Sequence, residues 1–308
     1  MENYTEGNDF ILNAFSDGGK GLNDLYFFTF LIIYLTTVLG NSLIITLTRV
    51  DPNLQTPMYF LLSNLSLLDL CYSSTTVPKM LQSFLNKPST ITLPACIVQM
   101  FMFLSLAASE SLLLAVMAYD RYVAICIPLR YVSIMSREVC LQLTCGIWLL
   151  GCIYGAIHTI NTFRLPFCGT RILNHFFCDI PPLLKISCID TYFNEVAVFA
   201  VGGVLMFSCF LLICGSYIHI LFSVLKLQKD NSKRKALSTC ISHLVAVLLF
   251  YVSGSLMYMR PKSNLITDKE WVLSIFYTCI TPLLNPLIYS LRNKDIQRAL
   301  TKLLKINH

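Results

Sequence analysis

Seven long apolar runs follow one another along the chain, and polar, often basic, segments separate them. Each run approaches the roughly 20 residues that a helix needs to cross a bilayer, and none alternates with the period of a barrel strand. The pattern predicts an all-α membrane protein, a seven-transmembrane helix bundle. The expected spans are Leu25–Leu47, Met58–Met80, Ile97–Ala118, Val139–Thr159, Val196–Leu221, Leu237–Met259 and Trp271–Leu291.

The segment after the last run predicts one further element. Apolar side chains recur there at helical spacing, at Ile296, Leu300 and Leu303. This favours a short amphipathic helix lying on the inner leaflet over a frayed polar tail. We therefore expect a single domain over residues 1–308, with an extracellular tail (1–24), the helix bundle (25–291) and a cytoplasmic tail (292–308).

Composition excludes an ordinary soluble domain. The chain is 55% hydrophobic and only 13% charged, whereas soluble domains have roughly 25% charged residues. A net charge of +6 would suit nucleic acid only if the bases formed one soluble face, but they lie between apolar runs. The expected surroundings are therefore a lipid bilayer, and no nucleic-acid partner is expected.

The distribution of bases predicts the orientation. If the amino terminus lies outside, the segments that follow the first, third, fifth and seventh spans lie inside. These inner segments hold 14 of the 23 Lys and Arg residues but only 5 of the 17 Asp and Glu residues. The positive-inside rule then predicts an extracellular amino terminus and a cytoplasmic carboxyl terminus. Asn3-Tyr4-Thr5 is a glycosylation sequon in that outer tail, so we expect glycosylation at Asn3.

Four cysteines lie on the expected outer side. Cys168, Cys178 and Cys188 belong to the longest outer loop, and Cys96 lies at the outer start of the third span. On the oxidising side they predict two disulfides, for which three pairings are open. His175-x-x-Cys178 has the spacing of half a metal site, but without a second pair of ligands nearby the disulfide interpretation is preferred.

Two acids lie well inside apolar runs, Asp69 in the second and Glu110 in the third. An ionised carboxylate there costs several kcal/mol unless it is paired or bound to a cation. One interpretation is a polar network with Asn41 and Asn285 that fixes helix packing. The other is a metal site, most plausibly for sodium, shared by Asp69 and Glu110. No other cofactor is expected.

Two further stretches have alternative interpretations. Asp120 and Arg121 end the third apolar run, where a charged pair marks either the membrane boundary or a switch. Pro282 and Pro286 each remove a backbone hydrogen bond from the seventh span. The resulting bend next to Tyr289 is either a hinge or only a kink.

Short motifs recur in order along almost the whole chain. They are Gly40-Asn41, Pro57–Ser66 with Asp69, Met117–Cys126, Pro128–Tyr131, Ser216-Tyr217, Lys235–Cys240 with Ser242–Leu244, and Pro282–Asn293. Together they resemble a rhodopsin-like G-protein-coupled receptor, specifically an odorant (olfactory) receptor of the class II, tetrapod-type group. The chain departs from that family at Val252-Ser253, where Gly-Thr is usual, and the bend of the sixth span is expected at Gly254.

The resemblance implies a receptor of olfaction in the plasma membrane, and no enzyme activity. It implies binding of a small-molecule odorant and activation of a heterotrimeric, stimulatory (olfactory-type) G protein that raises cyclic AMP. It also implies the disulfide pairs Cys96–Cys178 and Cys168–Cys188. Because no acid stands where amine receptors keep one, we expect a small, neutral, hydrophobic volatile as the ligand.

The resemblance also implies particular site residues. Ligand-lining positions in the outer half of the bundle would be Phe103, Leu104, Ala107, Ala108, Val201, Leu205, Tyr251, Ser255, Tyr258 and Thr278. The G-protein switch would comprise Asp120, Arg121, Tyr217, Asn285, Pro286 and Tyr289. In it, Asp120 would hold Arg121 in the inactive state and release it toward the two tyrosines on activation.

Two other classes of protein are weaker interpretations. A transporter or channel, with Asp69 and Glu110 along an ion path, would need further polar residues along a pore and preferably two related halves, and neither is visible. A membrane enzyme would need a nucleophile with its base, or a metal cluster, inside a span, and the sequence shows neither.

Overall fold

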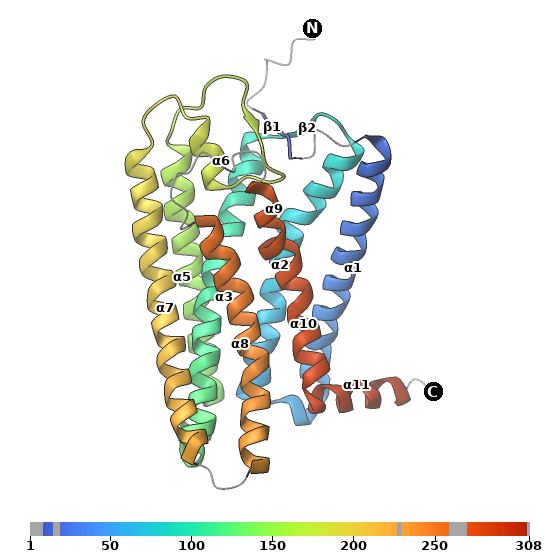
Figure 1. Ribbon diagram of the computed structural model, residues 1–308, viewed down its shortest axis with the longest axis vertical. Coiled ribbons are helices and arrows are strands. Elements are labelled where there is room, and N and C mark those ends of the chain that lie inside the picture. The colour runs from blue at the N-terminus through green and yellow to red at the C-terminus, as the bar shows by residue number, and fades with distance from the viewer. Residues whose placement is uncertain (1–8, 15–18, 227–229, 259–269, 307–308) are drawn as a thin grey trace.

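The computed structural model describes residues 9–14, 19–226, 230–258 and 270–306. Its long helices stand side by side in one bundle (Figure 1), which confirms the predicted seven-helix architecture. They are α1 (Lys20–Val50), α2 (Pro57–Leu85), α3 (Leu93–Cys126), α5 (Arg137–Phe163), α7 (Tyr192–Lys226), α8 (Asp230–Tyr258), and a seventh span made of α9 (Glu270–Ile275), the π-helical turn η3 (Phe276–Ile280) and α10 (Thr281–Arg292).

Six helices of the described chain are long and apolar enough to cross a membrane, and α2 is not among them. Its polar side chains explain why, because Asp69, Ser73 and Thr76 lower its hydropathy. All three are buried in the bundle. These three polar groups therefore face the interior of the bundle, where a membrane protein can pair them.

The third helix occupies the centre of the bundle and packs most extensively on α5. Two glycines of α5 make this contact close. A Cβ on Gly151 would lie 2.0 Å from the Ser109 hydroxyl, and one on Gly155 would lie 2.1 Å from the Ser105 hydroxyl. Small residues four apart on both helices let the two backbones approach, as is common between membrane helices.

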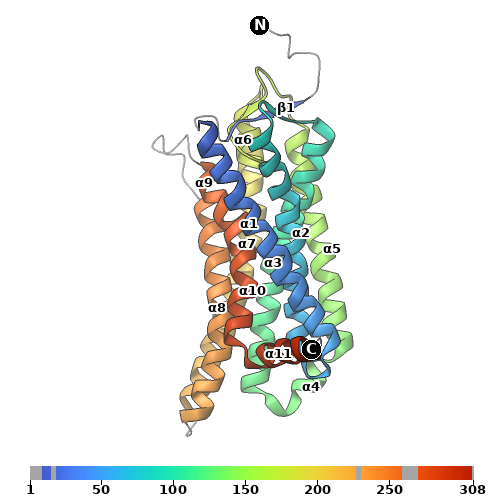
Figure 2. The same cartoon turned by 90° about the vertical axis from the view of Figure 1, so that its right-hand side faces the viewer.

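One end of the bundle, called here the α11 end, carries short connections and a crosswise helix. The connections are η1 (Pro52–Leu54), η2 (Pro128–Arg130) and α4 (Tyr131–Ile134). Helix α11 (Lys294–Ile306) runs across the bundle axis (Figure 2). Ile296 and Ala299 are buried against the bundle, whereas Arg298 and Lys302 are exposed. The predicted amphipathic helix is confirmed.

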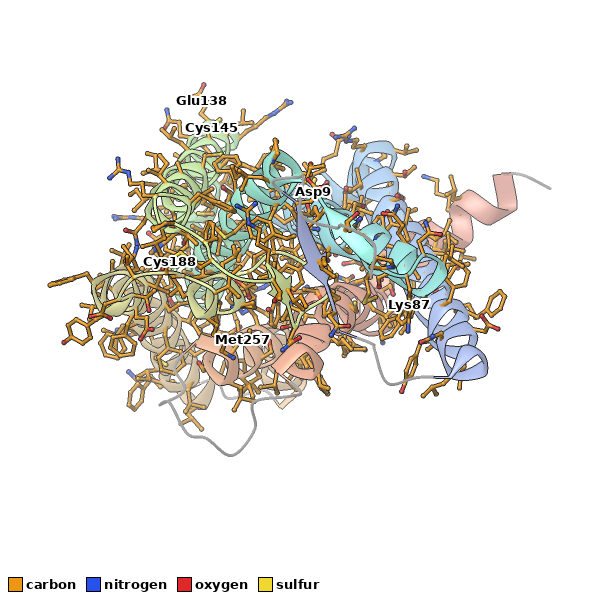
Figure 3. The ribbon with its side chains drawn as sticks, turned by 90° about the horizontal axis from the view of Figure 1, so that it is seen from above. Asp9, Lys87, Glu138, Cys145, Cys188 and Met257 are labelled. Carbon is orange, nitrogen blue, oxygen red and sulfur yellow. A yellow bond between two sulfur atoms is a disulfide. The ribbon has the colours of Figure 1, made fainter. Side chains whose placement is uncertain are left out.

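The opposite end, called here the sheet end, is covered by three short strands and the helix α6 (Ile180–Lys185). Strand β1 (Phe10–Leu12) is the middle strand, antiparallel to β2 (Ser89–Ile91) and parallel to β3 (Ile172–Leu173). Seen from above, β1 lies across the top of the bundle (Figure 3). The strands therefore connect three segments that are far apart in the sequence.

The seventh span is interrupted where the sequence analysis placed only a proline bend. Pro282 has no N–H to donate, and the turn before it widens into η3. The Thr281 hydroxyl donates to the Phe276 carbonyl at 3.1 Å. The Asn41 amide on α1 donates to the Pro282 carbonyl, also at 3.1 Å. Side chains thus satisfy backbone carbonyls at the interruption.

Candidate functional site

A cavity of about 100 Å³ lies in the half of the bundle nearer the sheet end. Its wall is mostly apolar and aromatic, with a few hydroxyl groups, as is typical of small-molecule sites. The lining residues are Tyr72, Phe103, Leu104, Ala107, Ala108, Tyr154, Ile180, Val198, Phe199, Gly202, Gly203, Leu205, Met206, Phe250, Gly254, Ser255 and Tyr277.

Phe103 on α3 is the centre of an aromatic cluster at this cavity. Its ring centroid lies 5.0 Å from that of Tyr72, 4.7 Å from that of Phe177 and 5.8 Å from that of Tyr277. These separations are the ones that aromatic pairs favour. The cluster joins α2, α3, the loop before α6 and the seventh span, so it fixes this wall of the cavity.

The loop before α6 closes over the cavity and is bound to the bundle at several points. Cys178 forms a disulfide with Cys96 at the start of α3, and its N–H donates to the Gln99 side chain at 3.0 Å. The Tyr277 hydroxyl of the seventh span donates to the Asp179 carboxylate at 3.4 Å. A second disulfide, Cys168–Cys188, closes the loop on itself. Both predicted pairs are confirmed.

His175 attaches the same loop to the seventh span. Its ring is fully buried, and Nε2 lies 2.8 Å from the Ser274 hydroxyl. The Phe177 N–H donates to Nδ1 at 3.4 Å, so Nε2 carries the proton and donates to Ser274. Burial lowers the pKa of His175 to about 3. The imidazole is therefore neutral at physiological pH, and the contact needs this neutral form.

Deeper in the bundle, buried polar side chains from α2, α3 and the seventh span lie close together. Asp69 is fully buried and accepts from the Asn285 amide at 3.2 and 3.1 Å, one bond to each carboxylate oxygen. The Glu110 carboxyl lies within electrostatic range of Asp69, and its Oε1 is buried without a hydrogen-bond partner. Asn41 donates to backbone carbonyls of α1 and of the seventh span.

At the α11 end, the charged pair of α3 has two different partners. Asp120 accepts from the Tyr131 hydroxyl of α4 at 2.8 Å. Arg121 is nearly buried, and its guanidinium donates to the Met58 sulfur, while its Nε has no partner. No ion pair joins Asp120 to Arg121 in the described part of the chain. Their expected pairing is therefore absent from this conformation, because α4 supplies the partner of the carboxylate.

The helices around Arg121 contribute three further polar side chains, Tyr217, His243 and Tyr289. The Tyr217 hydroxyl of α7 lies 2.8 Å from Nδ1 of His243 on α8, whose Nε2 lies 3.1 Å from the Leu114 carbonyl of α3. Tyr289 on α10 is buried, and its hydroxyl has no partner. Arg121 interacts electrostatically with both tyrosines. Four spans thus converge on one arginine.

The sequence profile of the olfactory receptor family matches residues 30–306. The chain belongs to the olfactory receptor family. It is 46% identical over 305 residues to Olfactory receptor 5M5 of Mus musculus, an alignment that covers 99% of this chain and 96% of that relative. It is also 46% identical over 302 residues to Olfactory receptor 8U8 of Homo sapiens, covering 98% and 94%.

The fold of this olfactory receptor is that of the rhodopsins. The crystal structure of squid rhodopsin superposes with a TM-score of 0.71 at 21% identity, covering 92% of this chain and 86% of that chain. The olfactory receptor is thus a multi-pass membrane receptor of the G-protein-coupled class and not an enzyme. The channel and enzyme interpretations are therefore set aside.

The structure brings most of the expected ligand-lining residues of the receptor together. Six of the ten line the cavity, namely Phe103, Leu104, Ala107, Ala108, Leu205 and Ser255. Three do not. Val201 points outward and is 41% exposed. The Tyr251 hydroxyl forms a hydrogen bond with the Ser111 hydroxyl, at 3.1 Å, and the Thr278 hydroxyl donates to the Ser274 carbonyl. The Tyr258 side chain lies outside the described residues.

The sequence analysis missed other lining residues of the receptor, and for α7 a signal was available. Val198, Gly202 and Leu205 recur at i, i+4 and i+7, one face of a helix. The expected Val201 is four residues from Leu205, or roughly 40° around the helix, so it lies at the edge of this face, and its side chain is 41% exposed. Tyr154 and Tyr277 gave no such signal: both lie in predicted spans, but which face of each span lines the cavity follows only from the packing of the helices.

Proposed function

We propose that this olfactory receptor binds a small, neutral, hydrophobic volatile in the cavity beneath the loop before α6. Binding then activates a stimulatory, olfactory-type heterotrimeric G protein at the α11 end and raises cyclic AMP. The receptor works in the plasma membrane, with the amino terminus outside the cell and α11 in the cytoplasm.

The composition of the cavity wall carries this proposal. None of the lining residues has a charged side chain, so an ionised ligand would lose its hydration without a compensating partner. The hydroxyls of Tyr154 and Ser255 can accept or donate one hydrogen bond to an aldehyde, ketone, ester or alcohol. The cavity volume of about 100 Å³ is below the roughly 300–1,000 Å³ of pockets for drug-sized ligands, so it favours a very small ligand.

Disulfides and charge support the proposed orientation. Both disulfides lie at the sheet end, which suits the oxidising exterior. The inner segments of the sequence carry the excess of bases. Asn3 lies outside the described residues, and the proposed orientation makes its sequon accessible to the glycosylation machinery.

The polar groups at the α11 end form the proposed switch. Arg121 lies between α7 and α10, within electrostatic range of Tyr217 and Tyr289. Asn285 and Pro286 lie about one turn from Tyr289, in the part of α10 where a proline interrupts the backbone hydrogen bonds. An odorant activates the receptor only by binding one arrangement of these helices better than the other.

We also propose a sodium ion at Asp69 and Glu110. The donor set fits a hard cation, because both side chains offer only oxygen and one Glu110 oxygen has no protein partner. A bound cation would also offset the cost of two neighbouring buried carboxyls. The ion would be held by these two residues, beside the Asn285 amide.

A panel of odorants, applied to transfected cells with cyclic AMP as readout, tests the function. Ala107→Leu fills the cavity and should weaken or abolish responses, whereas Val201→Leu, on the outward face of α7, should leave them unchanged. Arg121→Ala should abolish the signal while surface expression persists. A full response from Arg121→Ala would refute its role, and equal responses from the two leucine variants would refute the cavity.

The sodium site has a separate test. In membranes of transfected cells, basal activity should depend on the sodium concentration in the wild type. The dependence should vanish in Asp69→Asn and in Glu110→Gln. An unchanged sodium response in both variants would rule out a bound ion there.

A further inference from the structure

A second hollow of the receptor lies at the α11 end, on the side of the bundle where α1, α2, α4 and α5 meet. Its volume is about 680 Å³. The part toward the middle of the bundle has an apolar wall, with Ile45 from α1 and Phe60 and Leu67 from α2, whereas Val132 of α4 lies at the end of the bundle. Leu67 is 40% exposed. This wall therefore offers an apolar surface that no described segment covers.

The rim of the hollow toward the end of the bundle is polar and basic. Arg49, in the last turn of α1, and Arg137, in the first turn of α5, both line it and both are exposed. Neither guanidinium forms a hydrogen bond or an ion pair with any described residue. The side chains of Gln55 and Thr56 on the same rim have no hydrogen-bond partner among the described residues either.

Helix polarity adds to this positive charge. Both α2 and α5 begin at the rim, so the positive ends of two long helix dipoles point toward it. The Thr56 side chain does not cap α2. Of the nearby acids, Asp51 is engaged with Asn53 in η1, and Glu138 points outward from α5 (Figure 3). The rim therefore favours an anion beside an apolar wall.

We propose that this hollow binds an anionic phospholipid of the cytoplasmic leaflet. Arg49 and Arg137 hold its headgroup phosphate, and an acyl chain lies along Ile45, Phe60 and Leu67. The proposal rests on the orientation proposed above, which places the rim at the level of the inner headgroups. Lipid is the favoured occupant because the basic rim lies at the level of the headgroup phosphates and the apolar wall lies deeper in the membrane, at the level of the acyl chains.

The bound lipid would contact the segment that holds Asp120. Tyr131 lines the hollow and donates to that carboxylate at 2.8 Å. Asp120 immediately precedes Arg121 in the proposed switch. The lipid therefore touches α4 at the residue that links it to α3, and occupancy of the hollow favours the conformation in which this link is made.

Native mass spectrometry of the purified full-length receptor tests the binding directly. The probes are phosphatidylinositol bisphosphate, phosphatidylcholine and the water-soluble inositol phosphate headgroup. The variant is Arg49→Gln with Arg137→Gln. The control is Arg298→Gln, which removes an exposed base from α11, outside the hollow, where it pairs with Asp295. The readout needs neither an odorant nor a G protein, so its failure leaves the proposed function untouched.

The wild type and Arg298→Gln should retain the anionic lipid in preference to phosphatidylcholine. The double variant should bind it more than about tenfold more weakly, since each base near a phosphate contributes roughly fivefold. Equal retention by the double variant would overturn the site. Competition by the soluble headgroup as strong as by the lipid would make it a free-anion site instead. If the wild type and the control form a dimer and the double variant does not, a second copy of the receptor occupies the hollow, and the lipid proposal is wrong.

Discussion

Replacing Gly151 by alanine tests the close packing of α5 on α3. The new Cβ would lie 2.0 Å from the Ser109 hydroxyl and 2.6 Å from the Ser105 carbonyl oxygen. Ser109 could rotate away, at the loss of its contact with the Ile147 carbonyl. The Ser105 carbonyl belongs to the helix backbone and moves only with α3 itself. The substitution should therefore push the two helices apart.

The magnitude follows from two opposing effects. Overpacking costs about 1–3 kcal/mol, and the upper end applies where backbone blocks the new atom. Alanine gains about 1 kcal/mol over glycine inside a helix. Gly151→Ala should thus destabilise the receptor by about 2 kcal/mol. Gly146→Ala is the matched control on the same helix, because nothing lies within 4 Å of its Cβ, and it should gain up to about 1 kcal/mol.

Thermal unfolding of the two purified variants in the same detergent measures the difference. A gap of about 3 kcal/mol corresponds to roughly 5 °C in apparent Tm for a chain of this size. Surface expression in cells should rank the variants in the same order. If Gly151→Ala unfolds at the same temperature as Gly146→Ala, the two helices are not in the close contact described, and the reasoning fails.

Three other predictions concern the ligand cavity, the covering loop and α4. Gly202→Ala should change the odorant potency, read from concentration–response curves of cyclic AMP, up to about tenfold more than Gly203→Ala. A Cβ on Gly202 would lie 2.9 Å from the Tyr154 hydroxyl at the cavity, whereas nothing lies within 4 Å of one on Gly203. His175 is neutral when folded, with its pKa lowered from 6.5 to about 3, so the unfolded chain binds the extra proton. Stability should therefore fall as pH drops below about 6.5, by about 2 kcal/mol at pH 5, and thermal unfolding of His175→Gln should show a weaker pH dependence. Tyr131→Phe should lower stability in the same assay by about 1–3 kcal/mol, since it leaves a buried carboxyl without its donor. Tyr119→Phe, at an exposed position, should leave stability unchanged. Equal potency changes in Gly202→Ala and Gly203→Ala would contradict the position of Gly202 at the cavity. Equal stability of Tyr131→Phe and Tyr119→Phe would contradict the bond from Tyr131 to Asp120. A pH dependence of His175→Gln equal to that of the wild type would contradict the buried, neutral His175.

The bundle was predictable because its helices are specified by local patterns. Hydrophobic runs of spanning length marked the spans, and the period of Ile296, Leu300 and Leu303 marked α11. Membrane insertion makes this pattern unusually informative, because the backbone inside a bilayer has few alternatives to the helix. The disulfide pairs needed the family resemblance, since the spacing of the cysteines left three pairings open.

The parts that escaped prediction depend on groups far apart in the sequence. The Pro282 carbonyl cannot accept from Pro286, which has no N–H, and accepts instead from the Asn41 amide of α1. The bond from Tyr131 to Asp120 depends on how a connecting segment folds back on α3. A contact of Asp69 with Asn285 was one of the two interpretations that the sequence offered, and the pairing of α2 with α10 makes it. Such contacts follow from tertiary packing, which periodicity does not encode.

The middle position of β1 in the sheet has a practical consequence for tagging this receptor. Phe10 is fully buried, and Phe10–Leu12 hydrogen-bonds to β2 on one side and β3 on the other. An epitope tag fused ahead of Asp9 leaves these residues in place. A truncation that removes Leu12 would leave both outer strands without their shared neighbour. Export signals and detection tags are therefore best added upstream of residue 9, with the strand itself retained.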